Sequence, residues 1–331
     1  MGVTIGPAKA RLVAAWASVA LAVAARVAGA QTSILQRAVL QGQPAARDSA
    51  QKYYFSAAQL AAEGRYGPAI TDLRKAMEFL PHEPQLKVDM SALLMASGDR
   101  NAAVRELEPL VEGPNAFGPA VIQLGDFKLG DGDTTAAIDY YTRLTLGANP
   151  FPPALVRLGD VAQSQGKRIE AARYYREATR ADSTFPEAWL SLGSVYVIID
   201  RYAEALQAFD KAVAIDSSNQ TATQLRRLAQ QRKQDYDEGV AAGKMRARII
   251  VTATREEAAR VHGMLDGGAD FISLATSIST HPTKEVGGDL GFFGEGEMLP
   301  VVERAVRQLK PGEISPVLAL PSGFGIILRV N

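Results

Sequence analysis

The sequence predicts two fold classes in one chain: a solenoid of antiparallel helix pairs, followed by a small α+β domain. Two observations predict this order. A 34-residue period runs through the middle of the chain, and the pattern changes near Met245 to short strand-like and helical segments. With 331 residues, the chain is long enough for more than one domain with its own core.

The charge and the residue counts exclude several classes of protein. Lys plus Arg and Asp plus Glu each number 36, so the chain lacks the basic excess of a dedicated nucleic-acid binder. There is no cysteine and there are three histidines. Thiol catalysis, disulfides and iron–sulfur clusters are therefore excluded, and most zinc sites are not expected.

Residues 1–30 have the pattern of a secretory signal peptide. Lys9 and Arg11 precede an apolar run of 14 residues, LVAAWASVALAVAA, and the small-x-small sequence AGA follows and ends at Ala30. This order of charge, apolar run and small residues is typical of a cleaved export signal. We expect cleavage after Ala30 and a mature chain in the periplasm or outside the cell.

An uncleaved membrane anchor is the alternative for this segment. A helix that crosses a bilayer takes about 20 apolar residues, and here Arg26 follows a run of only 14. A lipid anchor on an N-terminal cysteine is excluded because the chain has no cysteine. Residues 31–49 are polar and mixed, which predicts a linker.

Residues 50–219 repeat every 34 residues, five times and without an insertion. One alanine recurs in each copy: Ala69, Ala103, Ala137, Ala171 and Ala205. A large apolar residue follows four positions later: Leu73, Leu107, Tyr141, Tyr175 and Phe209. A turn residue precedes the alanine by five positions: Gly64, Gly98, Gly132, Gly166 and Asp200. A small residue precedes it by twelve: Ala57, Ser91, Gly125, Gly159 and Gly193.

This pattern predicts a helix–turn–helix unit. The small residues let two helices approach closely, and the Gly or Asp position ends the first helix, where a left-handed backbone is easiest. The period and the residues resemble tetratricopeptide repeats (TPRs). The expected repeats are 50–83, 84–117, 118–151, 152–185 and 186–219.

Residues 220–244 predict a capping helix and linker, because they are polar and helical in composition and a solenoid end requires a cap. Such an array typically presents a curved surface to peptides or protein partners. A spacer without a ligand is the alternative.

The last ninety residues predict strands and helices in the order β-α-α-β-α-β-β. The run RARIIVTA opens the domain, and Thr254 begins a capping box before an amphipathic helix. Asp270 can cap a second short helix, and Pro300 starts a third. The strands PVLAL and GIILRV close the chain.

A glycine-rich stretch, GGDLGFFGEGEM at residues 287–298, raises the question of a phosphate cradle. Such a cradle takes glycines between a strand and a helix N-terminus, often with a lysine. Here the loop carries Asp289, Glu295 and Glu297 and no basic residue. The three carboxylates would repel a phosphate, so nucleotide binding is not expected.

This stretch, followed by LPVVERAVRQLKPGEIS and SGFGIILRV, resembles the parvulin family of peptidyl-prolyl cis–trans isomerases. The resemblance covers about residues 245–331. It implies a four-stranded sheet wrapped by helices, with a proline pocket on one sheet face and no cofactor or metal. The implied substrates are unfolded or proline-containing polypeptides.

The resemblance assigns the wall of the proline pocket to Leu290, Phe293 and Met298, with Gly291 and Gly294 turning the backbone so that the phenylalanine points inward. Ser322 matches a hydroxyl-bearing position beside the substrate amide. His281 falls roughly where many members have aspartate or cysteine. It is a candidate to hydrogen-bond the substrate amide, and the alternative is an exposed loop histidine.

Three positions depart from the family. Arg248 and Gly325 replace the two histidines that form a hydrogen-bonded pair beneath the substrate, and Val302 replaces an aromatic residue that packs on the proline. We expect Arg248 in the pocket floor, where a buried charge requires a partner such as Asp289 or Glu295.

Two functions follow as hypotheses. The first is an exported folding factor, a peptidyl-prolyl isomerase with weakened catalysis and a TPR interaction module. The second is a non-catalytic peptide-binding scaffold or chaperone that uses the same fold. The sequence leaves open whether the domain is an active enzyme.

Overall fold

The computed structural model describes residues 44–113 and 115–331. The described chain forms two compact units that divide between Leu144 and Thr145. The predicted signal peptide and most of the predicted linker lie outside the described residues. Within these ranges, every helix is too short or too polar to cross a membrane.

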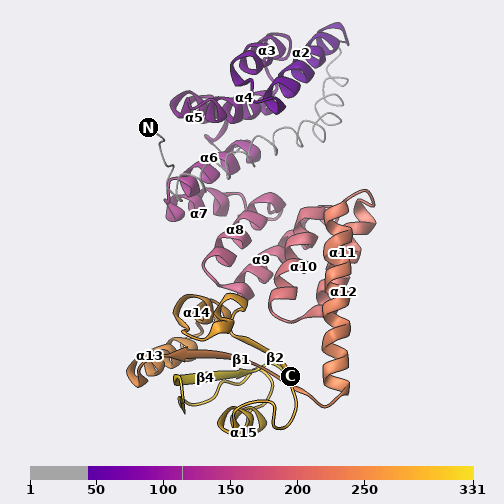
Figure 1. Ribbon diagram of the computed structural model, residues 1–331. Helices are drawn as coiled ribbons and strands as arrows, with labels where there is room; N and C mark the ends of the chain where they lie inside the picture. Colours follow the sequence, from indigo (N-terminus) through magenta and orange to yellow (C-terminus); the bar gives the residue numbers. More distant parts are fainter. Residues whose placement is uncertain (1–43, 114) are drawn as a thin grey trace, which may run out of the picture. The chain divides into compact units, whose positions relative to one another are not determined.

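The first unit consists of antiparallel helix pairs (Figure 1). Its helices are α2 (Pro44–Ala62), α3 (Tyr66–Phe79), α4 (Pro84–Ala96), α5 (Arg100–Leu107) with the short η1 (Glu108–Leu110), α6 (Gly118–Gly130) and α7 (Thr134–Arg143). Helix α2 begins inside the stretch predicted as a linker. Proline is favoured in the first turn of a helix because its fixed φ suits that position.

The second unit continues the same pattern and then changes class. Its helices are α8 (Pro152–Ser164), α9 (Arg168–Ala181), α10 (Pro186–Ile198), α11 (Tyr202–Ile215) and the long α12 (Gln220–Ala241). Proline stands at the start of α8 and of α10. Helix α12 packs on α11 and leads into the C-terminal domain.

The small residues of the repeat lie under the large ones of the partner helix. A Cβ atom added to Gly159 would lie 2.4 Å from the ring of Tyr175, and one added to Gly193 would lie 2.6 Å from the ring of Phe209. The recurring alanines are completely buried at 0% exposure. The predicted close packing of paired helices is therefore confirmed.

The turn position between paired helices has a left-handed backbone in every copy. Gly64, Gly98, Gly132 and Gly166 all have positive φ, and Asp200 follows them with a φ of 61°. A residue with a side chain costs roughly 1–2 kcal/mol in this conformation. The fifth copy therefore carries backbone strain that the others avoid.

The C-terminal domain is an antiparallel four-stranded sheet with helices on both faces (Figure 1). Its elements are β1 (Met245–Thr252), α13 (Arg255–Asp266), α14 (Phe271–Ile278), η2 (Pro282–Val286), β2 (Asp289–Phe293), α15 (Pro300–Gln308), β3 (Leu318–Leu320) and β4 (Gly323–Arg329). The strand order is β2-β1-β4-β3. The predicted fold class, TPR helix pairs followed by a parvulin-like α+β domain, is confirmed.

The two faces of this sheet have different covers. Ile249, Val251 and Ile327 pack on α15 through Val302 and Val306. On the other face, Ile250 and Ile326 pack on α13 and α14. The predicted caps are present, since Thr254 accepts a hydrogen bond from the N–H of Glu257 and Asp270 accepts one from Ser273.

We expect Gly159→Ala to lower the free energy of unfolding by about 1–3 kcal/mol, because the new methyl group overlaps the Tyr175 ring. Gly263→Ala is the matched control: Gly263 lies in α13 with open space around it, and alanine there gains roughly 0.5–1 kcal/mol of helix stability. Urea unfolding followed by Trp189 fluorescence and circular dichroism checks both. Equal effects at the two sites would contradict the packing argument.

Candidate functional site

An apolar cluster lies on the sheet face that α15 covers. It contains the four side chains assigned to the proline pocket, Leu290, Phe293, Met298 and Val302. Phe293 and Val302 are buried, at 1% and 4% exposure, whereas Leu290 and Met298 are half-buried and reach the surface. The structure therefore gathers these residues in one place and leaves two of them accessible to a ligand.

Other members of this cluster were not among the predicted residues. Ile249, Val251, Leu318 and Leu320 join it from β1 and β3. The alternation in RARIIVTA places residues 249 and 251 on one strand face, so the sequence carried a signal for those two. Nothing in the sequence indicated Leu320.

At two positions of the glycine-rich stretch, Gly288 and Gly291, the backbone conformation or a close contact favours glycine. Gly291 has a φ of 70°, and its N–H donates to Asp289 Oδ1 at 2.9 Å. A Cβ on Gly288 would lie 2.3 Å from the carbonyl oxygen of Ile249, so only glycine lets this loop reach β1. Gly294, the second predicted turning point, does not have a positive φ.

Backbone hydrogen bonds hold the chain between β2 and α15. The N–H of Gly294 donates to Glu297 Oε2 at 2.9 Å, and the N–H of Met298 donates to Glu303 Oε1 at 3.0 Å. Glu303 lies in the first turn of α15, where a carboxylate also favours the helix dipole. These bonds fix Met298 beside the cluster.

The carboxylates of the glycine-rich stretch have cationic partners. Asp289 pairs with Arg246, and Glu295 lies 3.4 Å from Arg307. Glu295 therefore pairs with Arg307 and not with Arg248, which corrects one of the two expected partners of Arg248. Burial alone would raise the pKa of Asp289, but the hydrogen bonds and charge of Arg246 outweigh it and hold the pKa below its usual value.

Leu320 fills the space at the second family-histidine position. Gly325 faces the apolar cluster, opposite Val251 in the sheet register. A Cβ atom at Gly325 would lie 2.5 Å from Leu320 Cδ1 and 3.7 Å from Ile249 Cδ1. A larger side chain at residue 325 therefore requires Leu320 to move.

Arg248, at the first family-histidine position, lies on the opposite sheet face. Side chains alternate along a strand, and Arg248 is paired with Leu328, which packs with Ile250 on the α13 and α14 side. This corrects the expectation that Arg248 forms the pocket floor. The resemblance gave a position in the sequence and did not show the direction of the side chain.

Both terminal nitrogens of the Arg248 guanidinium have partners where the side chain lies. Its Nη2 atom is 2.8 Å from Asp200 Oδ2 and 3.9 Å from Asp289 Oδ2. Its Nη1 atom donates to the carbonyl oxygens of Val286 and Gly287. The side chain is only 7% exposed, so these bonds compensate a charge that has left water.

His281 and Ser322 lie at the edges of the domain. The His281 Nδ1 atom accepts a hydrogen bond from the N–H of Thr283 at 3.3 Å and caps η2. Burial lowers the pKa of His281, which favours the neutral imidazole that this cap requires. Ser322 is exposed in the turn between β3 and β4. Within the described residues, no group of three acidic or histidine side chains could hold a metal.

Together, the helix-pair array and the antiparallel sheet with one apolar, partly open face define a class: a helical-repeat protein that ends in an isomerase-type domain. The family model of the PPIC-type peptidyl-prolyl isomerase domain matches residues 248–331, and a tetratricopeptide-repeat model matches residues 156–220.

Known proteins agree with this class. Peptidyl-prolyl cis-trans isomerase Pin1 of Arabidopsis thaliana is 39% identical over 87 residues, which cover 25% of this chain and 73% of that protein. Foldase protein PrsA of Geobacillus kaustophilus is 40% identical over 85 residues, 25% of this chain and 30% of that protein. The chain belongs to the parvulin family through its C-terminal domain.

The chain spans less than a third of the length of the Geobacillus protein. Among solved structures, PrsA of Bacillus anthracis is similar at 26% identity with a TM-score of 0.26, covering 40% of this chain and 70% of that chain.

We expect Gly325→His to lower the free energy of unfolding by about 1–3 kcal/mol, because the imidazole collides with Leu320. In the double variant Gly325→His with Leu320→Ala, the loss should be smaller than the sum of the two single losses. Chemical denaturation of all three variants checks this. Additive losses would mean that Leu320 does not occupy the histidine position.

We expect the cap at His281 to make stability depend on pH. Because the folded-state pKa lies below the usual value of 6.5, the unfolded chain binds more protons as the pH falls through 6.5, and stability decreases there. His281→Asn keeps a capping oxygen and should remove this decrease. Melting temperatures between pH 7.5 and 5 check it, and a decrease of unchanged size in His281→Asn would contradict the argument.

Proposed function

We propose that this protein is an exported folding factor, and that its C-terminal domain binds proline-containing segments of unfolded polypeptides and isomerises their X-Pro bonds. The observation that carries this proposal is the apolar cluster around Phe293, which is open at Leu290 and Met298. Family membership through this domain supports the same reaction.

The reaction is a rotation, so the site has to act on amide resonance. The barrier to rotation about a peptide bond is about 18–20 kcal/mol, and uncatalysed X-Pro exchange takes tens of seconds or longer. The planar amide has more charge separation than the twisted one, because resonance is lost as the bond turns. An apolar pocket that removes water from the amide therefore disfavours the planar form relative to the transition state.

The residues of the cluster suit this role because they are aliphatic or aromatic. Leu290 and Met298 offer contact to a proline ring, and Ile249, Val251 and Leu320 form an apolar floor. No nucleophile takes part in a rotation. Ser322 and His281 remain candidates to hydrogen-bond the substrate amide from the edges, which their positions in exposed and half-buried loops allow.

Weak catalysis fits the departures from the family. The two positions of the family's histidine pair no longer face each other, since Arg248 has turned to the opposite face and Leu320 covers Gly325. Val302 offers less contact than an aromatic ring, a difference of roughly 1–3 kcal/mol of apolar contact. These observations favour a second candidate function, a peptide-binding chaperone that does not isomerise its client.

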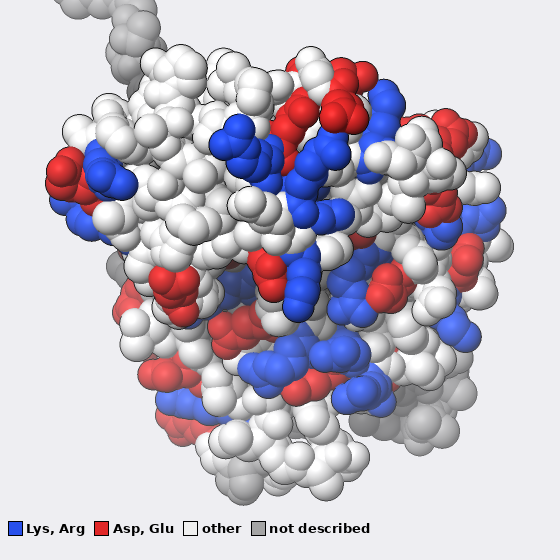
Figure 2. Space-filling view, turned by 90° about the horizontal axis from the view of Figure 1, so that it is seen from below, with Lys and Arg blue, Asp and Glu red and all other residues white. Residues whose placement is uncertain are grey.

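The repeats support a protein-interaction role. A groove of about 710 Å³ runs between α9, α10 and α11, and Trp189, Tyr196 and Arg176 are among the residues that line it. On the face seen in Figure 2, where the C-terminal domain is viewed from below, basic and acidic side chains lie beside one another and neither charge dominates. The lack of a basic surface there disfavours a nucleic acid as the partner. The signal-like residues 1–30 support export with cleavage after Ala30.

The test is an isomerisation assay on the full chain with the peptide succinyl-Ala-Ala-Pro-Phe-p-nitroanilide. We expect a rate above the uncatalysed one. Met298→Ala and Leu290→Ala should each lower kcat/KM about tenfold, because about 1.4 kcal/mol of apolar contact with proline is lost.

Met264→Ala is the matched control, since Met264 is 47% exposed on α13 and lies outside the cluster. It should leave the rate unchanged. Peptide binding by fluorescence anisotropy without any acceleration would replace the isomerase with the chaperone. Absence of both binding and acceleration would refute both functions.

A further inference from the structure

The sheet face behind the apolar cluster is only partly covered by the domain's own helices. Helices α13 and α14 pack on Ile250 and Ile326 at one end. At the other end, the face carries the side chains of Arg246 and Arg248, which are 8% and 7% exposed. The fifth repeat, which belongs to the same compact unit, covers these two arginine side chains.

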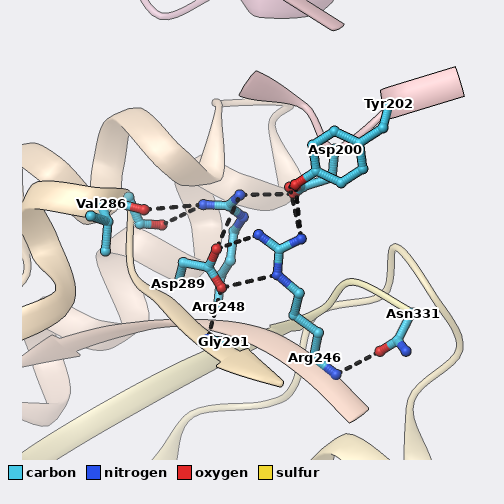
Figure 3. Close-up of polar contacts among 9 residues, drawn as sticks. Asp200, Tyr202, Arg246, Arg248, Val286, Asp289, Gly291 and Asn331 are labelled. Carbon is cyan, nitrogen blue, oxygen red and sulfur yellow. Dashed lines mark hydrogen bonds and ion pairs between the residues drawn. The ribbon is translucent and has the colours of Figure 1, made fainter. Parts of the chain in front are cut away.

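Two residues of the fifth repeat contact these arginines: Asp200 contacts both, and the Tyr202 hydroxyl accepts a hydrogen bond from Arg246 Nη1 at 3.0 Å (Figure 3). The Oδ2 atom of Asp200 is 2.8 Å from Arg248 Nη2, and its Oδ1 atom is 3.1 Å from Arg246 Nη1. The Tyr202 hydroxyl donates to Asp200 at 2.7 Å, and burial together with Asp200 raises the pKa of Tyr202 to about 12, so that it remains a donor. The four other copies of the repeat have glycine at this turn.

Asp289 continues this set of contacts into the strand that carries the cluster (Figure 3). Arg246 Nε donates to Asp289 Oδ1 at 3.2 Å, and Arg246 Nη2 is bonded to Asp289 Oδ2. The same Asp289 Oδ1 atom accepts the N–H of Gly291 at 2.9 Å. A continuous path of polar contacts thus runs from Asp200 through Arg246 and Asp289 to the turn between Leu290 and Phe293.

Strand β2 is also held between two apolar contacts. Phe293 points into the cluster, and its neighbour Phe292 points the other way, toward α12. The Phe292 ring meets Tyr236 edge-on at 5.6 Å between centroids, with the Arg246 guanidinium at 5.8 Å. A Cβ on Gly239 would lie 2.6 Å from the Phe292 ring, so the helix closely approaches the strand.

The fourth repeat makes a second contact of the same kind. Arg168 forms an ion pair with Asp270, the cap of α14, and donates to Ser273 Oγ at 2.9 Å. Arg168 precedes Tyr202 by one 34-residue repeat, so corresponding turns of two successive repeats both contact the domain.

We propose that the fifth repeat and α12 cover the part of the sheet face that the domain's own helices leave open. Within this contact, Asp200 is a positioning residue for the proline pocket, and it acts through Arg246 and Asp289 on the Gly291 turn. The expected effect on the peptide assay rests on the proposed function. The expected effect on hydrogen exchange rests only on the contacts of β2. The proposal also explains why an arginine stands at residue 248 in place of the family's histidine, because the arginine side chain reaches Asp200 of the fifth repeat.

The experiment compares Asp200→Gly with Asp210→Asn in the full chain. Glycine accepts the left-handed turn, so Asp200→Gly removes the charge without straining the repeat. Asp210 forms a more exposed ion pair with Arg226, between α11 and α12 of the same region, and serves as the matched control. Hydrogen exchange by mass spectrometry is followed in segments 287–298 and 255–266, with the melting temperature measured in parallel.

We expect Asp200→Gly to speed exchange in segment 287–298 at least tenfold, and clearly more than in segment 255–266. The melting temperature should fall, because Arg246 and Arg248 lose a buried partner. In the succinyl-Ala-Ala-Pro-Phe-p-nitroanilide assay, KM should rise severalfold with kcat little changed. Arg246→Gln should speed exchange in segment 287–298 in the same way, and adding Asp200→Gly to it should cause no further acceleration there. Asp210→Asn should change none of these quantities.

Unchanged exchange in segment 287–298 in Asp200→Gly would overturn the inference, whatever the assay shows. Faster exchange in a protein that neither binds nor isomerises the peptide would uphold the structural coupling and refute the proposed function. A general fall in melting temperature with equal acceleration in both segments would reduce Asp200 to an ordinary stabilising residue, which also overturns the inference.

Discussion

The ion network of Asp200, Arg246, Arg248 and Asp289 is the interaction on which the C-terminal half of the molecule depends. Two positive and two negative side chains leave water together, with exposures between 7% and 19%. Such a buried network adds little to the free energy of unfolding compared with apolar side chains of similar volume. Removing one member, however, leaves an uncompensated buried charge, which is strongly destabilising. The network therefore specifies one arrangement of repeat and sheet, and this arrangement offsets the strained backbone of Asp200.

Because side chains alternate along β1, the two faces of the sheet carry different kinds of residue. Odd-numbered residues such as Ile249 and Val251 build the apolar cluster, and even-numbered residues such as Arg246 and Arg248 build the contact with the repeats. The same division holds in β2 for Phe293 and Phe292. The apolar cluster and the polar contact with the repeat array therefore do not compete for the same surface.

Much of the fold follows from the sequence because its determinants are local. The left-handed turns, the rings stacked over Gly159 and Gly193 and the caps at Thr254 and Asp270 each depend on residues close in the chain. The gathering of Leu290, Phe293, Met298 and Val302 was also predicted, from the parvulin resemblance. The direction of Arg248 and the position of Leu320 over Gly325 were not, because both depend on strand pairing and on partners distant in sequence. Asp200 was predicted only as a residue that ends a helix, and its contact with the sheet was not predicted for the same reason.

The contacts of Arg168 and Asp200 also determine where the repeat array can change length. Each of these turns contacts its own part of the C-terminal domain, one at α14 and the other at β1 and β2. Duplicating or deleting a 34-residue copy at this end would put a glycine turn where the aspartate is required. A change in the number of copies at this end would therefore break the contacts that hold the C-terminal domain, so the last two copies and that domain form one structural unit.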